Sequence, residues 1–275
     1  MNTINASFDA EVTQGERFEF GKNWKNFITH LNADRIAEAE KSLIEYLGDL
    51  KDKNFIDIGS GSGLFSLAAK NSGASVLSID FDPSSVYCTK QLKEKYYSID
   101  ANWKVKQASV LDKDYLNTLG QFDIVYSWGV LHHTGKMWEA LENVCSLVAK
   151  SGLLFIAIYN EQGFLSRYWT SVKIIYNKGS VGRILMSVIH IPYFFTRVLV
   201  AGLVKYKNPF KYFSNYKKQR GMSVWHDWID WLGGYPFETA EPEQIKIFYE
   251  QKGFELTKIK TTNSLGCNEF VFKKK

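Results

Sequence analysis

Short apolar runs alternate with longer amphipathic segments along most of the chain. The apolar runs predict five strands, at Asn54–Ile58, Ser75–Asp80, Trp103–Ser109, Phe122–Tyr126 and Leu153–Tyr159. Apolar residues at helical spacing predict helices at Asn32–Leu47, Leu64–Asn71, Pro83–Tyr97 and Lys136–Val148. The last of the five runs is almost wholly apolar, which is typical of a strand buried on both faces of a parallel sheet. The alternation predicts a doubly wound α/β sheet with right-handed crossovers.

The alternation stops at Asn160 and resumes near Glu241. The resumption predicts a helix at Pro242–Lys252 and strands at Phe254–Lys260 and Asn268–Lys273. We therefore expect an N-terminal cap at residues 1–50, a core at 51–159 and 241–275, and a helical insertion at 160–240.

Charge is concentrated in the insertion. The 275 residues hold 34 Lys and Arg against 29 Asp and Glu, a net charge of +5, and 45% of them are apolar. That composition excludes a disordered or collagen-like chain. From Ser151 to Met222 there are eleven Lys or Arg and one acid, Glu161, so this zone carries +10 and the remaining residues together −5. The basic character is therefore local.

Cysteine spacing and the lengths of apolar runs indicate in which cellular compartment the protein is expected. Cys88, Cys145 and Cys267 are far apart, so we expect neither a zinc site nor a disulfide framework. The first twenty residues lack the basic and apolar regions of a signal peptide. The longest apolar zone is Val181–Tyr206, and its interruptions predict that it does not cross a bilayer: Arg183, His190, Pro192 and Arg197. We expect a cytoplasmic protein.

A glycine-rich turn follows the first predicted strand, Asp57-Ile58-Gly59-Ser60-Gly61-Ser62-Gly63. Glycine lets a ligand approach the backbone. The sixth position of a dinucleotide fingerprint is Leu64 here, and no Gly-Lys-Ser/Thr follows, so neither a dinucleotide nor a P-loop site is expected. Asp57 suits a ligand that carries a positive charge. Asp80, at the end of the second strand, is placed to accept hydrogen bonds from ribose hydroxyls.

Four ordered motifs carry a resemblance: DIGSGSG, SIDFD, QASVLD and FDIVYSWGVLHHT. Together they resemble the class I S-adenosylmethionine-dependent methyltransferases, and most closely the branch of the ubiquinone-biosynthesis O-methyltransferases. The resemblance covers residues 51–159 and 241–273. It implies a Rossmann-like sheet of seven strands with the last strand antiparallel, an insertion after the fifth strand, and S-adenosyl-L-methionine as cofactor.

The resemblance also implies residue roles. Asp57 would face the methionine ammonium, and Asp80 the ribose hydroxyls, with Phe81 beside the adenine. Ser109 and Val110 would contact the adenine ring, and Ser127 the methionyl part. The turn residues that would line the methionine and ribose are Gly59, Ser60, Gly61 and Gly63. The segment Phe18–Trp24 resembles N-terminal segments that fold over the cofactor in this family.

Two histidines, His132 and His133, follow the fourth strand. The ordinary imidazole pKa, about 6.5, suits removal of a proton from an acceptor near neutral pH. The alternative is that they cap the next helix or pack beneath the cofactor. A second candidate acid/base pair is His226 and Asp227. Related quinone methyltransferases have carboxylates where this chain has Gly129 and His132, so no metal is expected.

Aromatic residues predict the acceptor wall. The segment Met222–Pro236 holds three tryptophans, a histidine and two aspartates within ten residues. Pockets combine apolar walls with a few polar groups. The candidate acceptor contacts are Trp128, Tyr159, Trp225, Trp231 and Tyr235. The alternative is that these tryptophans dock the insertion onto the core.

These patterns predict O-methylation of a small or lipid-like acceptor, such as a quinone, phenol or glycan precursor, by in-line methyl transfer with histidine-assisted deprotonation. The basic insertion is open to four interpretations. It is a lid over the acceptor, a surface resting on the inner face of an anionic membrane, a phosphate-binding surface, or a solvated face. The alternative function is an RNA-modifying methyltransferase that uses Lys217, Lys218 and Arg220. The Asn/Asp-Pro-Pro-Tyr motif of enzymes that methylate exocyclic amines of bases is missing, which disfavours this alternative. A third hypothesis is a cofactor-binding protein without catalysis.

Overall fold

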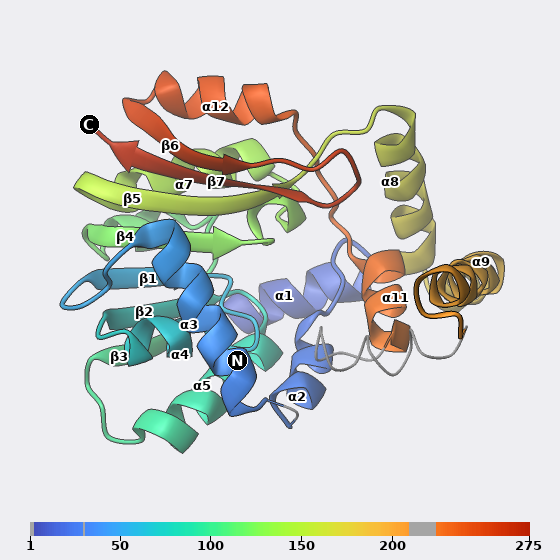
Figure 1. Ribbon diagram of the computed structural model, residues 1–275, viewed down its shortest axis with the longest axis horizontal. Coiled ribbons are helices and arrows are strands. Elements are labelled where there is room, and N and C mark those ends of the chain that lie inside the picture. The colour runs from blue at the N-terminus through green and yellow to red at the C-terminus, as the bar shows by residue number, and fades with distance from the viewer. Residues whose placement is uncertain (1–2, 30, 209–223) are drawn as a thin grey trace.

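The computed structural model describes residues 3–29, 31–208 and 224–275, except for the side chains of residues 3, 25–27 and 226 (Figure 1). It contains a seven-stranded sheet in the order β3-β2-β1-β4-β5-β7-β6. Strand β7 is antiparallel to both of its neighbours, and the pairs from β3 to β5 are parallel. The predicted Rossmann-like α/β fold is therefore confirmed. The strands are β1 (Asn54–Ile58), β2 (Ser75–Asp80), β3 (Trp103–Gln107), β4 (Phe122–Trp128), β5 (Val148–Tyr159), β6 (Phe254–Lys260) and β7 (Cys267–Lys274).

Helices cover both faces of the sheet because alternate residues of its strands point to opposite faces. One core joins the sheet to α6 (Lys113–Asn117), α7 (Met137–Leu147) and α12 (Pro242–Glu250). The other joins it to α3 (Ala33–Leu47), α4 (Leu64–Asn71) and α5 (Pro83–Tyr97). Neighbouring β1 residues divide between them, with Phe55 in the second core and Ile56 in the first.

The sequence pattern located most elements and missed three helices. Helix α3 begins one residue after Asn32, whose side chain accepts the Arg35 N–H at 3.1 Å and so caps the helix. Strand β5 begins at Val148, earlier than predicted, since Val148 pairs with Phe122. The pattern missed α6 and two N-terminal helices, α1 (Thr3–Thr13) and α2 (Gly21–Thr29). The apolar period is weak in α1 and α6 has only five residues, whereas α2 is amphipathic over nine residues and was detectable from its sequence.

The described part of the insertion forms three helices, α8 (Phe164–Asn177), α9 (Ser180–Tyr206) and α11 (Val224–Gly233). They share a third core that contains Trp169, Phe194 and Trp228. Lys217, Lys218 and Arg220, on which the RNA hypothesis depends, lie outside the described residues. In Figure 1, α9 lies at the edge of the molecule far from the sheet.

Helix α9 bears on the expectation that its apolar zone does not cross a bilayer. The helix runs unbroken through Arg183, His190, Pro192 and Arg197, for 27 residues with a mean hydropathy of 1.7 over its most apolar window. By length and composition alone it is able to cross a membrane. The proline and the isolated charges do not break the helix. They also leave its mean hydropathy in the range of a membrane-spanning helix.

Candidate active site

A cavity of about 1120 Å³ opens where the parallel strands end. Ligands of open α/β sheets bind outside the carboxyl ends of the strands. The loops after β1 to β4 form one side of the cavity, residues of α1 and α2 and the loop between them close a second, and the insertion helices form a third. Loop residues from the sheet and aromatic residues from the insertion therefore share one space.

The turn after β1 holds its backbone close to neighbouring groups. Gly59 has φ +79°, and a Cβ there would lie 2.4 Å from the Val130 side chain, so a larger residue does not fit without movement. The Gly61 N–H donates to Oδ2 of Asp80 at 2.9 Å. The turn is therefore closely packed, and Gly59, Ser60 and Gly61 lie at the cavity wall.

Asp80 has room for two more hydrogen bonds. Its Oδ1 accepts the Asp82 N–H and its Oδ2 the Gly61 N–H, each at 2.9 Å. A carboxylate has about four lone-pair sites, and the Asp80 side chain lines the cavity. Burial raises its pKa to about 7, and the neighbouring Asp82 charge adds to the rise. The free lone pairs fit a pair of vicinal hydroxyls.

Asp57 is a buried carboxylate at the floor of the cavity, 2% exposed. Its Oδ2 accepts the Ser66 hydroxyl at 2.6 Å. Burial raises its pKa to about 7, although the Ser66 hydrogen bond opposes the rise. A cationic group beside it would favour the ionised form. The site is therefore suited to a ligand with a positive charge.

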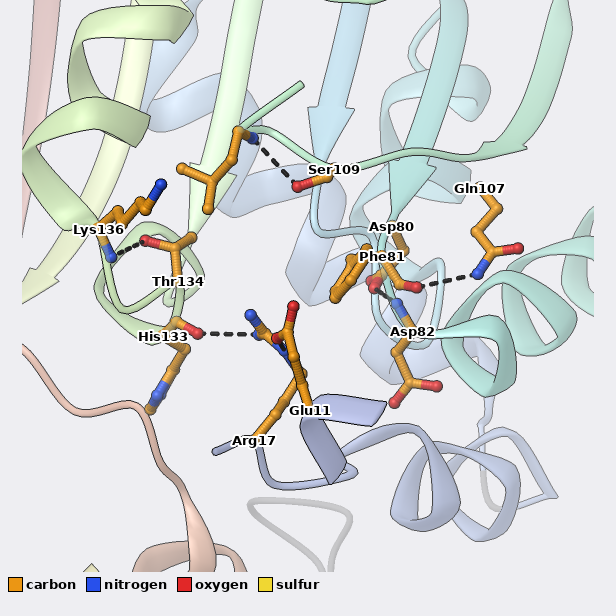
Figure 2. Close-up of polar contacts among 11 residues, drawn as sticks. Glu11, Arg17, Asp80, Phe81, Asp82, Gln107, Ser109, His133, Thr134 and Lys136 are labelled. Carbon is orange, nitrogen blue, oxygen red and sulfur yellow. Dashed lines mark hydrogen bonds and ion pairs between the residues drawn. The ribbon is translucent and has the colours of Figure 1, made fainter. Parts of the chain in front are cut away.

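A flatter part of the cavity wall follows β2 and β3. Phe81, Ser109 and Val110 line it, and Phe8 from α1 packs edge-on against Phe81 at 5.4 Å between ring centroids. The Gln107 amide donates to the Phe81 carbonyl at 3.1 Å, and Ser109 Oγ accepts the Leu111 N–H (Figure 2). These bonds fix the loops around a space that suits an aromatic base.

The N-terminal segment is tied to both sides of the cavity. Arg17 donates from Nη1 to the His133 carbonyl at 3.0 Å and pairs through Nε with Glu11 at 2.6 Å (Figure 2). Its guanidinium also lies 4.9 Å from the centroid of the Phe81 ring. On the other side the Gly21 N–H donates to Asp82 at 2.7 Å. The segment therefore lies along the cavity at the strand ends.

Residues 56–154 match the model of a methyltransferase domain. The core of this chain is a class I S-adenosylmethionine-dependent methyltransferase. The match covers the strands and loops that carry the four motifs, and the sheet has the antiparallel last strand of that class. The cofactor of the family is S-adenosylmethionine.

Curated relatives differ in what they modify. The chain is 29% identical over 117 residues to a ubiquinone biosynthesis O-methyltransferase of Coxiella burnetii, covering 42% of this chain and 48% of that protein. It is 25% identical over 167 residues to a tRNA U34 carboxymethyltransferase of Colwellia psychrerythraea, covering 56% and 51%. The chain thus spans about half the length of the curated relatives it matches. At this identity the acceptor is not defined by likeness.

A solved structure shares the fold over more of the chain. The magnesium protoporphyrin IX methyltransferase of Synechocystis, solved with S-adenosylhomocysteine, superposes with a TM-score of 0.53 at 13% identity. The superposition covers 88% of this chain and 83% of that one. Since its identity is so low, this likeness concerns the fold.

The two adjacent histidines of the methyltransferase core lie in different surroundings. His133 lines the cavity, whereas His132 is wholly buried and does not. The Tyr159 N–H donates to His132 Nδ1 at 3.2 Å, so the ring proton of the neutral form lies on Nε2, which has no partner among the described residues. Burial lowers the pKa of His132 well below its usual value. The structure thus does not bring His132 to the reacting space.

His133 is a neutral base at the cavity wall. Its Nδ1 lies 2.5 Å from the Pro236 carbonyl, an acceptor, so the ring proton is on Nδ1 and the lone pair on Nε2. Burial lowers its pKa to about 3, and the charges of Lys173 and Arg17 contribute. A base this weak removes protons poorly from an alcohol or phenol at neutral pH.

Asp230 is a titratable group of the cavity that was not among the predicted site residues. It lines the cavity from α11, one helical turn after Asp227, and accepts a hydrogen bond from the Asn23 side chain of α2. Burial raises its pKa to about 7, against the opposing effect of Lys173. The acid was visible within the tryptophan-rich segment, but nothing in the sequence distinguished it from Asp227.

Lys173 was also missed, because a single lysine in a helix usually faces solvent. Here it is 1% exposed and donates to the Trp231 carbonyl near the end of α11. Its ammonium lies 4.5 Å from the Trp231 ring centroid and 4.9 Å from that of Phe237. Burial lowers its pKa to about 7, while Asp230 raises it. Lys173 therefore lies buried close enough to Asp230 for each charge to influence the pKa of the other.

The predicted acceptor contacts divide into two groups. Trp128, Tyr159 and Trp231 line the cavity together with Asp227. Trp225 is 48% exposed and packs edge-on against Trp228, and the Tyr235 carbonyl accepts the Phe18 N–H at 2.8 Å; neither residue lines the cavity. Further aromatic residues that sequence reasoning did not select line it as well: Trp169, Tyr193, Phe194 and Trp228.

The remaining predicted residues are placed as follows. The turn residues Gly59, Ser60 and Gly61 line the cavity. Gly63 precedes α4, where a Cβ would lie 3.0 Å from Thr89, and Ser127 donates to the Ile58 carbonyl at 2.9 Å; both lie behind the wall. The His226 side chain is outside the described residues. Within the described part of the chain, no cluster of His, Cys, Asp and Glu is arranged to hold a metal ion.

Proposed function

We propose that this methyltransferase transfers a methyl group from S-adenosylmethionine to an oxygen atom of a small or lipid-like acceptor. The observation that carries the proposal is the single cavity in which Asp57 and Asp80 meet the aromatic wall of the insertion and Asp230. The cofactor supplies a methyl group already activated on a sulfonium. The protein then needs to hold two reactants together, which is worth about 7–11 kcal/mol of the barrier.

We assign the cofactor to the strand-end side of the cavity. Asp57 would pair with its ammonium and Asp80 with its ribose hydroxyls, while Gly59, Ser60 and Gly61 form the wall beside it. Phe81, Ser109 and Val110 would contact the adenine. Residues 1–50 would act as a cap over this half and residues 160–240 as the acceptor side.

We assign removal of the acceptor proton to Asp230. A general base works best with a pKa near the working pH, and Asp230 meets that condition at about 7, whereas His133 at about 3 does not. Asn23 and Lys173 would position and tune this carboxylate. His133, with its Nε2 lone pair, would orient the acceptor hydroxyl.

The acceptor half favours an apolar molecule. Its wall combines Trp169, Phe194, Trp228 and Trp231 with few polar groups, which suits a ring or an aliphatic chain. An anionic membrane contacted from the cytoplasmic side is a natural source of such an acceptor, and the +10 charge of the insertion region supports that contact.

Labelling of an extract tests the proposal. The purified protein is incubated with methyl-tritiated S-adenosylmethionine and a total cell extract, and label is followed into organic, aqueous and RNA fractions. Alkali-stable label in the organic fraction, identified by mass as a methyl ether, is the expected result. The matched control is Asp80→Ala, which should abolish labelling.

Label confined to RNA would instead support the alternative function, for which the tRNA-modifying relatives are the motive. Label in no fraction, with the cofactor bound, would support a binding protein without catalysis. Either result would refute the proposed acceptor class.

A further inference from the structure

Helix α9 is apolar on the side that faces away from the protein. Its buried residues recur every fourth position from Gly182 to Gly202 and pack against α8 and α11. Only 22% of its most apolar window is buried. A core helix of a soluble protein would be mostly buried, so the apolar composition of α9 is not explained by packing.

The exposed apolar residues of α9 form a stripe away from the buried one. They are between 49% and 80% exposed: Val181, Ile184, Leu185, Val188, Ile189, Tyr193, Val200, Leu203 and Val204. Charged residues of α9, such as Arg183 and Arg197, fall outside this stripe. Exposed apolar patches of this kind mark interaction surfaces.

The surroundings of the stripe are cationic. From residue 162 to 208 the sequence has no Asp or Glu. Six cations there are exposed, and none forms an ion pair with another described residue: Arg167, Lys178, Arg183, Arg197, Lys205 and Lys207. An apolar stripe bordered by cations is complementary to an anionic lipid surface.

The same helix reaches the cavity. Tyr193 and Arg197 line it and are also exposed, and the Arg197 guanidinium lies 5.7 Å from the Tyr193 ring centroid. Phe194, on the buried side, lines the cavity as well. The entrance of the cavity therefore adjoins the surface that carries the apolar stripe.

We propose that the exposed face of α9 lies in the surface of an anionic bilayer, and that the acceptor enters the cavity from that bilayer past Tyr193 and Arg197. The route of the acceptor rests on the function proposed above, whereas the docking does not. The helix lies in the surface rather than spanning it because its other face is engaged. His190 is 5% exposed and bonded to the Tyr168 hydroxyl at 2.9 Å and the Met186 carbonyl at 2.8 Å.

Vesicle flotation tests the docking with the full chain. We expect the protein to float with vesicles of phosphatidylcholine and phosphatidylglycerol, and far less with phosphatidylcholine alone. Ile184→Gln with Val188→Gln should abolish flotation, and both positions are exposed, so folding is retained. The matched control is Ile99→Gln, an apolar residue 94% exposed on another surface, which should float as the wild type does.

Charge is tested separately. Arg183→Gln with Lys205→Gln should lower the partition coefficient about fivefold per cation removed. Lys104→Gln with Lys106→Gln, two exposed lysines of β3, should leave it unchanged. Calorimetry with S-adenosylmethionine accompanies each variant, so that failure of docking is distinguished from failure of the cofactor site.

Four results would overturn the proposal. Wild-type protein that binds the cofactor but ignores anionic vesicles at low salt has no such surface. Protein that resists alkaline carbonate extraction has α9 across the bilayer. A dimer in solution that Ile184→Gln with Val188→Gln converts to a monomer has a second copy on this face. Flotation that the Ile99→Gln control loses equally is unspecific.

Discussion

The carboxylate of Asp80 provides the sharpest test of the cofactor site. Asp80→Asn keeps the shape of the side chain and removes its charge. Each carboxylate oxygen already accepts one backbone N–H, from Asp82 or Gly61, at 2.9 Å. One lone pair on each oxygen remains for a ribose hydroxyl.

The magnitude follows from those two remaining bonds. Hydrogen bonds to a charged group contribute about 1.5–3 kcal/mol each, so their loss costs about 3–6 kcal/mol. The amide group of asparagine also places its NH₂ against one of the two backbone N–H donors in either orientation. Rotation of the side chain therefore does not recover the lost binding energy. We take the lower bound, since water replaces part of the interaction, and expect the dissociation constant to rise about 100-fold.

Titration calorimetry measures the dissociation constant of Asp80→Asn for S-adenosylmethionine and, in parallel, for S-adenosylhomocysteine. Because the two ligands share the ribose, both should weaken by the same factor. Asp114→Asn, at an exposed position in α6, is the matched control and should bind as the wild type does. A change below about fivefold in a variant that melts normally would refute the assignment of Asp80 to the ribose.

Three further predictions follow from the same geometry. Burial raises the pKa of Asp57 and of Asp80 to about 7, and a cationic ligand favours their ionised forms, so binding of S-adenosylmethionine should release protons. The affinity should therefore rise with pH up to about 7 and then level. Calorimetry in buffers of different ionisation enthalpy measures the proton release, and proton uptake would contradict the prediction. Asp230→Asn should lower the methyl-transfer rate about 10²–10⁴-fold at neutral pH and remove the rise in rate near pH 7. His133→Gln should keep that rise. An unchanged pH–rate profile in Asp230→Asn would exclude Asp230 as the base. Gly59→Ala should lower the free energy of unfolding by about 1–3 kcal/mol, because φ is +79° and the new Cβ would lie 2.4 Å from the Val130 side chain. Adding Val130→Ala to this variant should restore part of the melting temperature. A melting temperature that does not recover would contradict the contact.

Local patterns were sufficient for most of the fold. The five parallel strands and the helices between them follow from apolar runs and helical spacing, since burial on two faces or on one stripe leaves a period in the sequence. The motif turn also places Asp57, Gly59 and Asp80 at the strand ends without knowledge of the tertiary structure, because parallel strands end at one edge.

The chemistry of individual side chains needed the folded chain. His132 and His133 are neighbours in sequence, yet only His133 lines the cavity. Asp230 is held by Asn23, which lies 207 positions away, and its pKa depends on burial and on Lys173 from another helix. Sequence spacing contains no measure of desolvation, so it gave no reason to prefer Asp230 to Asp227.

The sequence by itself determined the sheet, the cofactor loops and the local excess of positive charge. Each of these is encoded in residues close together along the chain. The tertiary structure alone decided which groups share the cavity, which lysine is buried and which face of α9 remains apolar and exposed. Those properties depend on what packs against a residue, and the packing partners come from segments far apart in sequence.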